Sequence, residues 1–91
     1  MLVLPAVLRH DEAPACMRML QQGLAAQSPE SVAVVDATAL AQFDSSALAV
    51  LLECRREAAA HGRDFAVKGL SPRLRELATL YGVAGLLPSA T

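Results

Sequence analysis

The chain has 91 residues and a formal net charge of −1, and 54% of its residues are apolar while only 3% are aromatic. This length predicts a single domain over residues 1–91, with one modest core built from Leu, Val and Ala. The near-neutral charge gives no electrostatic attraction to nucleic acid, and the shortage of rings excludes a stacking surface for single strands.

Membrane and secretion signals are not expected in this chain. The apolar stretch 1–8 lacks a basic start and a small-residue cleavage site, and no apolar run is long enough for direct membrane insertion. Cys16 and Cys54 are too few for a disulfide framework and lie in helix-like stretches. We interpret them as small apolar side chains in a reducing compartment, and we expect a cytoplasmic protein.

The chain begins with an apolar stretch that Pro5 interrupts. Because proline donates no ladder hydrogen bond, residues 2–8 predict an edge strand or a strand with a break. Residues 15–26 then carry apolar side chains at helical spacing and predict a helix. Asp11 is its expected N-cap and Pro14 fits its first turn.

A short β-branched run follows the first helix, which Pro29 ends. Residues 31–36 are apolar on both faces and predict a central strand that is covered on both sides. Residues 36–43 are expected to be a connection. Asp44 is then the expected N-cap of a second helix, which His61 and a left-handed Gly62 would end; its apolar stripe is Leu48, Leu51, Leu52, Ala58 and Ala59.

The remaining segment predicts a strand, a helix and a packed tail. Residues 64–69 read as the third strand, and Ser71 with Pro72 predicts the start of the last helix. The apolar face of that helix would consist of Leu74, Leu77, Ala78 and either Leu80 or Tyr81. The order βαβαβα predicts right-handed crossovers and an α/β fold with a small, mainly parallel sheet.

No pattern in the sequence predicts catalysis. His10 lies in a polar loop and His61 at a helix end, and the glutamates are scattered over expected solvent-facing positions. There is no phosphate-binding glycine loop and no metal-ligand spacing. We therefore predict no catalytic residue, no metal and no cofactor. The charged stretch 53–56 on the second helix is interpreted as a solvated face.

The segment Phe43-Asp44-Ser45-Ser46-Ala47-Leu48 places two hydroxyls at the start of a helix that follows a strand and a loop. Free N–H groups and the helix dipole favour an anion at such a position. An ordinary N-cap explains the same residues, because Asp-Ser-Ser before an apolar run is a common helix start. Local sequence leaves both interpretations open.

The strand that ends at Asp36, together with residues 43–52, resembles the signature of STAS domains, the family of anti-sigma-factor antagonists and of sulfate-transporter cytoplasmic tails. The stretches 62–70 and 71–83 are similar to the family's next strand and closing helix, so the resemblance covers residues 31–88, whereas residues 1–30 agree only in layout. Ala47 stands where the family usually has glycine. The resemblance implies a STAS-like fold and a non-catalytic regulatory protein that binds partner proteins through Asp44, Ser45, Ser46 and Ala47.

Two branches of the family imply different partners. In the STAS subunit of the Mla phospholipid-trafficking ABC transporter, the hydroxyl directly after the Asp helps to hold the ATPase subunit, and this role maps onto Ser45. In anti-sigma-factor antagonists the second hydroxyl is phosphorylated by a serine kinase, and this role maps onto Ser46. The compact length and the stretch 77–88 are more similar to the Mla branch.

The resemblance therefore implies, first, a cytoplasmic adaptor that binds the ATPase of a lipid-transport ABC complex and lies at the inner membrane through that partner. The alternative is an anti-sigma-factor antagonist that phosphorylation of Ser46 regulates in a partner-switching pathway. A third hypothesis is a small enzyme or nucleotide binder that uses the helix N-terminus for phosphate. The lack of a Lys or Arg near Ser45 weakens it.

Overall fold

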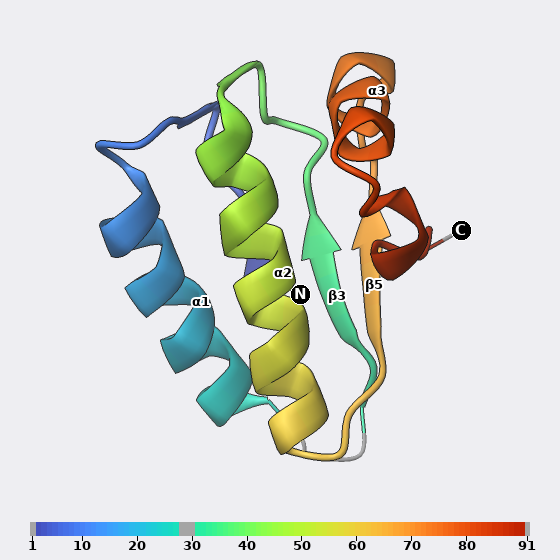
Figure 1. Cartoon of the computed structure of the whole chain (residues 1–91). Helices are drawn as coiled ribbons and strands as arrows, with labels where there is room; N and C mark the ends of the chain where they lie inside the picture. Colours follow the sequence, from blue (N-terminus) through green and yellow to red (C-terminus); the bar gives the residue numbers. More distant parts are fainter. Residues whose placement is uncertain (1, 28–30, 91) are drawn as a thin grey trace.

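The computed structural model describes residues 2–27 and 31–90. Its elements follow one another in the order β1 (Leu2–Val3), β2 (Val7–Leu8), α1 (Ala13–Ala26), β3 (Ala33–Asp36), β4 (Gln42–Phe43), α2 (Ser45–Ala60), β5 (Phe65–Lys68), α3 (Pro72–Leu80) and a 3-10 turn η1 (Ala84–Leu86). Figure 1 shows α1 and α2 side by side, with β3 and β5 to their right. None of the described helices is long and apolar enough to cross a membrane.

The main sheet has the strand order β1-β3-β5, and both strand pairs are parallel. The register pairs Leu2 with Val35 and Val35 with Val67. This confirms the predicted α/β class, the mainly parallel sheet, the N-terminal edge strand and the central position of the strand at 33–36. Beyond β5, Ser89 forms an isolated parallel bridge with Val67.

Pro5 divides the N-terminal stretch between two sheets. β1 belongs to the main sheet, whereas β2 pairs in parallel with β4, with Val7 opposite Gln42 and Leu8 opposite Phe43. The prediction that residues 36–43 are only a connection was therefore incomplete. A strand of two residues carries no periodic signal, and its partner lies about 35 residues away in the chain.

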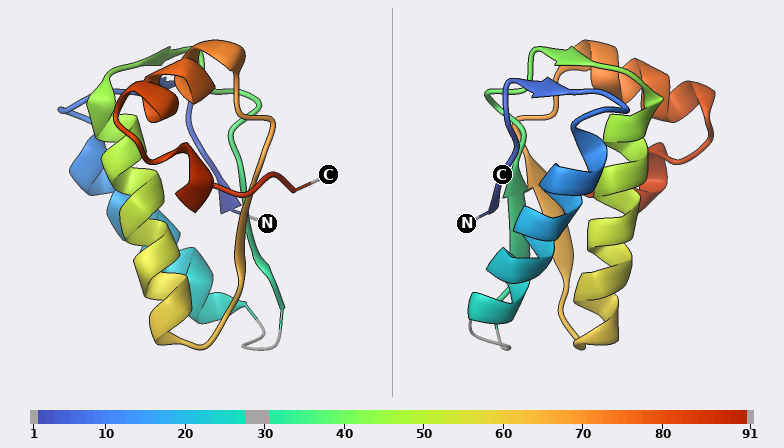
Figure 2. Two further views of the ribbon diagram at one scale, coloured as in Figure 1. Left: turned by 45° about the vertical axis from the view of Figure 1, so that its right-hand side comes forward. Right: turned by 90° about the vertical axis from the view of Figure 1, so that its left-hand side faces the viewer.

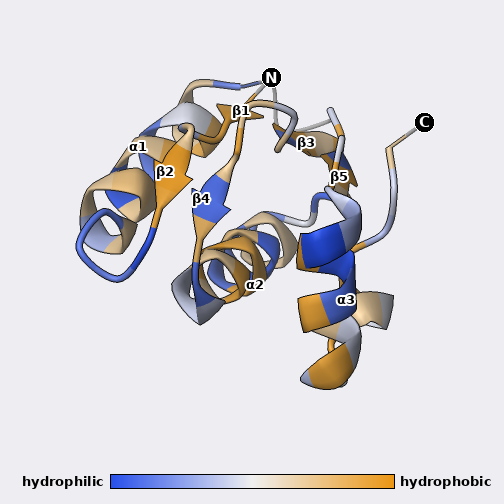
Figure 3. Cartoon of the chain, turned by 90° about the horizontal axis from the view of Figure 1, so that it is seen from above, coloured by the Kyte–Doolittle hydropathy of each residue, from blue (hydrophilic) through white to orange (hydrophobic). Residues whose placement is uncertain are grey.

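The core lies between the main sheet and the helices. Ala33, Val35, Phe65 and Val67 point from the strands into this core, where they meet the buried faces of the helices. Figures 2 and 3 show that the three helices lie on one side of the main sheet. The prediction that β3 is covered on both sides is thus wrong for the described residues, since Val34 on the opposite face is only partly buried.

The first helix begins two residues earlier than predicted, and its N-cap is Glu12 instead of Asp11. The N–H groups of Glu12 and Ala13 both donate to the Arg9 carbonyl at 3.0 Å, so a turn over residues 9–13 leads into the helix. The Glu12 carboxylate accepts from the Arg9 N–H at 3.0 Å. The predicted end at residues 27–30 agrees with a helix that stops at Ala26, and residues 28–30 lie outside the described part.

The other predicted helix ends are confirmed. Asp44 and Ser71 each cap a helix through a side-chain oxygen, and Pro72 opens α3. Gly62 and Gly82 follow α2 and α3 with φ of 70° and 72°.

The prediction that either Leu80 or Tyr81 belongs to the apolar face of α3 is wrong. Leu80 is 80% exposed and Tyr81 57% exposed. The last turn of α3 passes beyond the core, which holds Leu74 and Ala78 instead.

Both cysteines are free and buried, as expected for small apolar side chains. Burial raises the pKa of the Cys54 thiol to about 11. Cys54 therefore does not belong to the solvated face predicted for residues 53–56, although Glu53 and Arg56 in that stretch do form an exposed ion pair at 3.5 Å. The tail packs as predicted through Leu87, which is 1% exposed.

Arg63 joins three parts of the chain, and sequence analysis had not singled it out. Its side chain is buried, and the guanidinium and Nε donate to the Ser31 carbonyl at 2.8 Å, the Leu24 carbonyl at 3.3 Å and the Gln27 Oε1 at 2.6 Å. Arg63 thereby links the end of α1 and the start of β3 to the turn that follows α2.

Arg63→Lys should destabilise the protein by about 2 kcal/mol, because an ammonium group cannot reproduce these forked hydrogen bonds in a buried position. Urea denaturation followed by circular dichroism measures this loss. Arg55→Lys, on an exposed part of α2, is the matched control and should change stability by less than about 0.5 kcal/mol. Equal stability of the two variants would show that the Arg63 contacts are not stabilising.

Candidate functional site

The Asp44 carboxylate connects two segments that meet at the start of α2. One oxygen, Oδ1, accepts from the Ser46 N–H at 2.8 Å and so caps the helix. The other oxygen, Oδ2, accepts from the His10 N–H at 3.1 Å in the turn before α1. A single side chain therefore fixes the first turn of α2 against the entry to α1.

These hydrogen bonds lower the pKa of Asp44. The largest cause is the bond from the Ser46 N–H, and the bond from the His10 N–H adds to it. Both bonds stabilise the charged carboxylate. Asp44 is therefore an anion at neutral pH, and a second negative charge placed beside it would be repelled.

The predicted site residues differ in how much solvent they meet. Ser45 is exposed, Asp44 and Ser46 are partly buried, and Ala47 is completely buried in the core. Ala47 was predicted to bind a partner, but its methyl group packs inside the protein, so it belongs to the core and does not form part of the surface. Ser45 is thus the most accessible member of the motif.

An apolar groove begins at Ser45 and runs between α2 and the end of α3. Its volume is ≈ 370 Å³, and it is lined by Ser45, Leu48, Ala49, Leu52, Tyr81 and Val83. Ser45, Ala49 and Leu52 follow the i, i+4, i+7 spacing of one helix face. The α2 helix therefore carries a second, outward apolar stripe in addition to its buried face.

A second groove borders the same helix on its other side. It lies between α1 and α2 with a volume of ≈ 350 Å³, and its lining residues are His10, Ala13, Pro14, Met17, Ala49, Val50 and Glu53. Ala49 is exposed and lines both grooves. The outer surface of α2 is thus a low ridge at Ala49 with a shallow apolar groove on each side. We call this surface the α2 ridge.

Two contacts hold neighbouring segments in place beside the α2 ridge. The Arg9 guanidinium donates to the Gln42 Oε1 at 2.7 Å, which ties the turn before α1 to β4. The Arg73 guanidinium lies over the Phe43 ring, 5.5 Å from its centroid, and so brings the first turn of α3 next to the residue that precedes Asp44.

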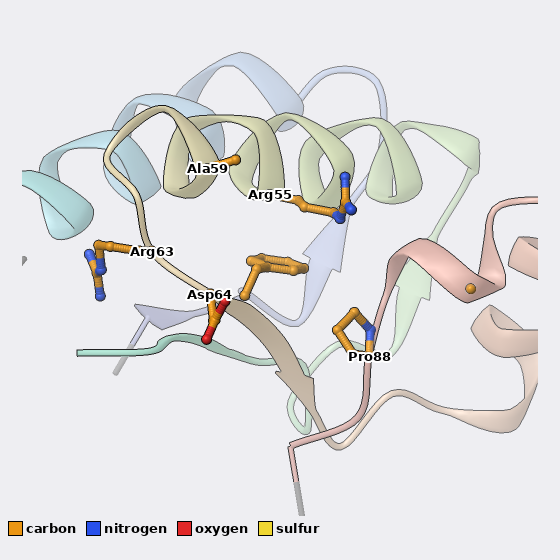
Figure 4. Close-up of a pocket in the computed structure, with 7 residues that line it drawn as sticks. Arg55, Ala59, Arg63, Asp64 and Pro88 are labelled. Atoms are coloured by element: carbon orange, nitrogen blue, oxygen red, sulfur yellow. The ribbon is translucent and has the colours of Figure 1, made fainter. Parts of the chain in front are cut away.

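Another cleft lies away from this surface. Its volume is ≈ 460 Å³, and Figure 4 shows Arg55 and Pro88 on one side of it and Arg63 pointing away from them. His61 caps α2, with its Nδ1 2.8 Å from the Glu57 carbonyl oxygen, as expected for a structural histidine. Within residues 2–27 and 31–90, no group of three or more His, Cys, Asp or Glu could hold a metal ion.

Tyr81 and Ala49 are the surface residues that sequence reasoning missed. Tyr81 had been considered for the buried face of α3, and Ala49 had no assigned role. The only signal for Ala49 is the outward repeat of small or apolar residues at 45, 49 and 52, which is visible once the buried stripe at 48 and 51 is set aside.

The stability of the protein should depend on Asp44 above about pH 4. Because the folded state lowers the pKa of Asp44, its stabilising effect is present above the unfolded-state pKa and is lost as the pH falls through the folded-state value. Asp44→Asn keeps an acceptor for Ser46 but not for His10, whereas Asp44→Ala loses both.

The expected order of unfolding free energy at pH 7 is therefore wild type, then Asp44→Asn, then Asp44→Ala. Urea denaturation at pH 7 and pH 2.5 measures this order, and the difference between wild type and Asp44→Asn should shrink at pH 2.5. A difference that does not change with pH would contradict the role of the Asp44 charge.

Comparison with known proteins agrees with this fold. A solved structure, an anti-sigma-factor antagonist (STAS) domain protein from Planctomyces limnophilus, superimposes with a TM-score of 0.77 at 20% sequence identity; the match covers 98% of this chain and 80% of that one. No curated protein matches the chain by sequence. The family model described as "Mlab, STAS domain" matches residues 1–88. The chain therefore belongs to the STAS domain family.

Proposed function

We propose that this protein is a non-catalytic adaptor that binds and regulates the ATPase subunit of a phospholipid-transport ABC transporter. STAS domains are in general regulatory or binding domains. The description of the matching family model, "Mlab, STAS domain", supports the transporter branch of the family. On this proposal the chain lies at the inner membrane only through its partner.

The observation that carries the proposal is the outward apolar stripe on α2. An isolated domain has no need of apolar residues on the solvent face of an amphipathic helix, and such a patch commonly marks a site of protein contact. The stripe begins at Ser45, the position that the resemblance assigns to ATPase binding. Two exposed side chains, Leu80 and Tyr81, lie nearby at the end of α3.

The geometry also indicates what the partner must supply. A ridge of small residues with a groove on each side admits close approach of a partner helix, whose apolar side chains would enter the grooves. Ser45 adds one accessible hydroxyl at the end of the ridge for a directional hydrogen bond. Among the residues that the structure describes, no charged side chain lines the groove between α2 and α3.

Ala49→Arg should weaken binding of the ATPase by about 100-fold or more, because a long charged side chain on the ridge would prevent the close approach of the partner. Isothermal titration of the purified ATPase measures this effect. Ala60→Arg is the matched control, since Ala60 is also an exposed alanine of α2 but lies 11 residues further along, roughly 16 Å away. Binding of Ala49→Arg at wild-type strength would contradict the proposal.

Ser45→Arg tests the hydroxyl end of the same surface. It should abolish co-purification with the ATPase while leaving the unfolding midpoint near that of the wild type, because Ser45 is exposed and the cap is made by Asp44. Undiminished co-purification of a folded Ser45→Arg variant would rule out the assigned role of Ser45.

The alternative function is an anti-sigma-factor antagonist with Ser46 as the phosphoacceptor, and the similar fold of the Planctomyces limnophilus protein favours it. Phosphate on Ser46 would stand beside the charged Asp44 carboxylate and compete with it for the helix N-terminus. Affinity capture from the native cytoplasm, with mass spectrometry of bait and prey, separates the functions. An ABC ATPase captured by an unmodified bait supports the adaptor, whereas a serine kinase or anti-sigma factor with phosphate on Ser46 supports the alternative.

A further inference from the structure

The two grooves beside the α2 ridge differ in charge. The lining of the groove between α2 and α3 is uncharged over the described residues, whereas the groove between α1 and α2 has Glu53 on its wall. The other titratable group in that second groove is His10, and none of the described residues that line it is a lysine or an arginine. The groove between α1 and α2 is therefore the negative side of the ridge.

Glu53 continues the crest of the α2 ridge. Ser45, Ala49 and Glu53 follow one another at intervals of four residues, so they lie along one line of the helix surface. Ser45 and Ala49 line the groove on the α3 side, and Ala49 and Glu53 line the groove on the α1 side. Along the helix axis Ser45 and Glu53 are roughly 12 Å apart. The ridge thus has a hydroxyl at one end and a carboxylate at the other.

The Glu53 carboxylate is only loosely neutralised within the chain. In the part of the chain that the structure describes, its one ion pair is with Arg56 at 3.5 Å; the Arg56 side chain is 80% exposed and that of Glu53 is 40% exposed. Arg56 lines neither groove. Exposed pairs of this kind contribute little, because water and salt screen them. Glu53 can therefore exchange Arg56 for a cation that approaches from the groove.

A partner that covers the ridge must accommodate this carboxylate. Contact would remove water from Glu53, whose side chain is already more than half covered. An ionised carboxylate that loses water without gaining a cation opposes binding. An apolar partner surface at this position would therefore bind poorly, whereas a lysine or arginine would bind well and would fix the orientation of the partner.

We propose that Glu53 selects the partner helix that the α2 ridge accepts, by pairing with a lysine or arginine of that helix. The inference rests on the proposed function, in which the partner is the ATPase subunit. Apolar side chains of the helix would enter the groove between α2 and α3, and small ones would pass over Ala49. The basic side chain would enter the groove between α1 and α2. A helix laid along the ridge in the reverse direction would bring that cation near Ser45 and leave Glu53 unpaired.

Two substitutions at Glu53 test the charge, with isothermal titration of the purified ATPase as the measurement. Glu53→Lys should weaken binding by about 100-fold, because two cations then face each other, and Glu53→Met by about 10-fold, because the partner's cation loses its counter-charge. Glu76→Lys is the matched control. It makes the same change of net charge at an exposed position of α3 that lines neither groove, and it should alter binding by less than about 3-fold.

These variants should keep the wild-type unfolding midpoint, because lysine and methionine are good helix formers and the ion pair that is lost is exposed. Glu53→Met also separates the proposal from its simplest alternatives. If the partner placed an apolar surface against Glu53, removal of the carboxylate would strengthen binding, and if Glu53 stayed in water, binding would not change. Either result would overturn the proposal.

Arg56→Ala should act in the opposite direction. It removes the cation that competes within the chain for Glu53, so binding of the ATPase should strengthen by about 3-fold. Weaker binding of this variant would show that Arg56, and not a cation of the partner, belongs with Glu53 in the complex.

The decisive experiment restores binding from the other side. ATPase variants in which each surface lysine or arginine is replaced singly by glutamate are titrated with Glu53→Lys, and one of them should bind it at least about 10-fold more tightly than the wild-type ATPase does. No recovery with any variant would overturn the proposal. A wild-type protein that does not bind the ATPase would remove the proposed function and this inference with it. Binding that Ala49→Arg disrupts but both Glu53 variants leave intact would remove this inference alone.

Discussion

The two hydrogen bonds of the Asp44 carboxylate are the local constraint on which the candidate surface depends. They join the first turn of α2 to the turn before α1, so that the two helices enter the structure from a common point. The α2 helix then buries Leu48, Leu51 and Cys54 while Ser45 and Ala49 remain outside. The position of the α2 ridge between its two grooves follows from this arrangement.

The same carboxylate bears on the choice between the two functions. Asp44 holds the helix N-terminus as an anion, and its Oδ1 already uses the Ser46 N–H. A phosphate added to Ser46 would be repelled by the Asp44 carboxylate, and this repulsion would offset its attraction to the helix dipole. Ser45 has no such conflict, because it is exposed and lines an apolar groove. The local electrostatics thus fit an adaptor that needs no modification to bind.

Much of the fold could be predicted from local patterns. The strand predicted within residues 31–36, the cap at Asp44 and the Ser71-Pro72 helix start are each encoded within a few neighbouring residues. All three are present, the strand as Ala33–Asp36. The short β4 strand could not be predicted in this way, because it exists only through its pairing with β2. Arg63 reads as a solvent-exposed residue after a glycine, yet it is buried by segments that converge from elsewhere in the chain.

The candidate site, like the fold, can be predicted from the sequence only in part. The motif at residues 44–46 is visible in the sequence, whereas the grooves beside it are not, since they form where α1 and α3 meet α2. Ala47 shows the limit of reading a motif residue by residue, because the adjacent Ser45 faces solvent while Ala47 faces the core. Only the helix orientation, which tertiary packing sets, tells which motif residues a partner can reach.

Hydrogen–deuterium exchange of the unmodified protein, with and without the purified ABC ATPase, shows directly whether the ATPase binds at the α2 ridge. Binding at this surface should slow exchange in the first half of α2 and at residues 80–83, with no change at the far end of α2. Protection confined to other surfaces, or no protection in a mixture at high micromolar concentration of both proteins, would contradict it.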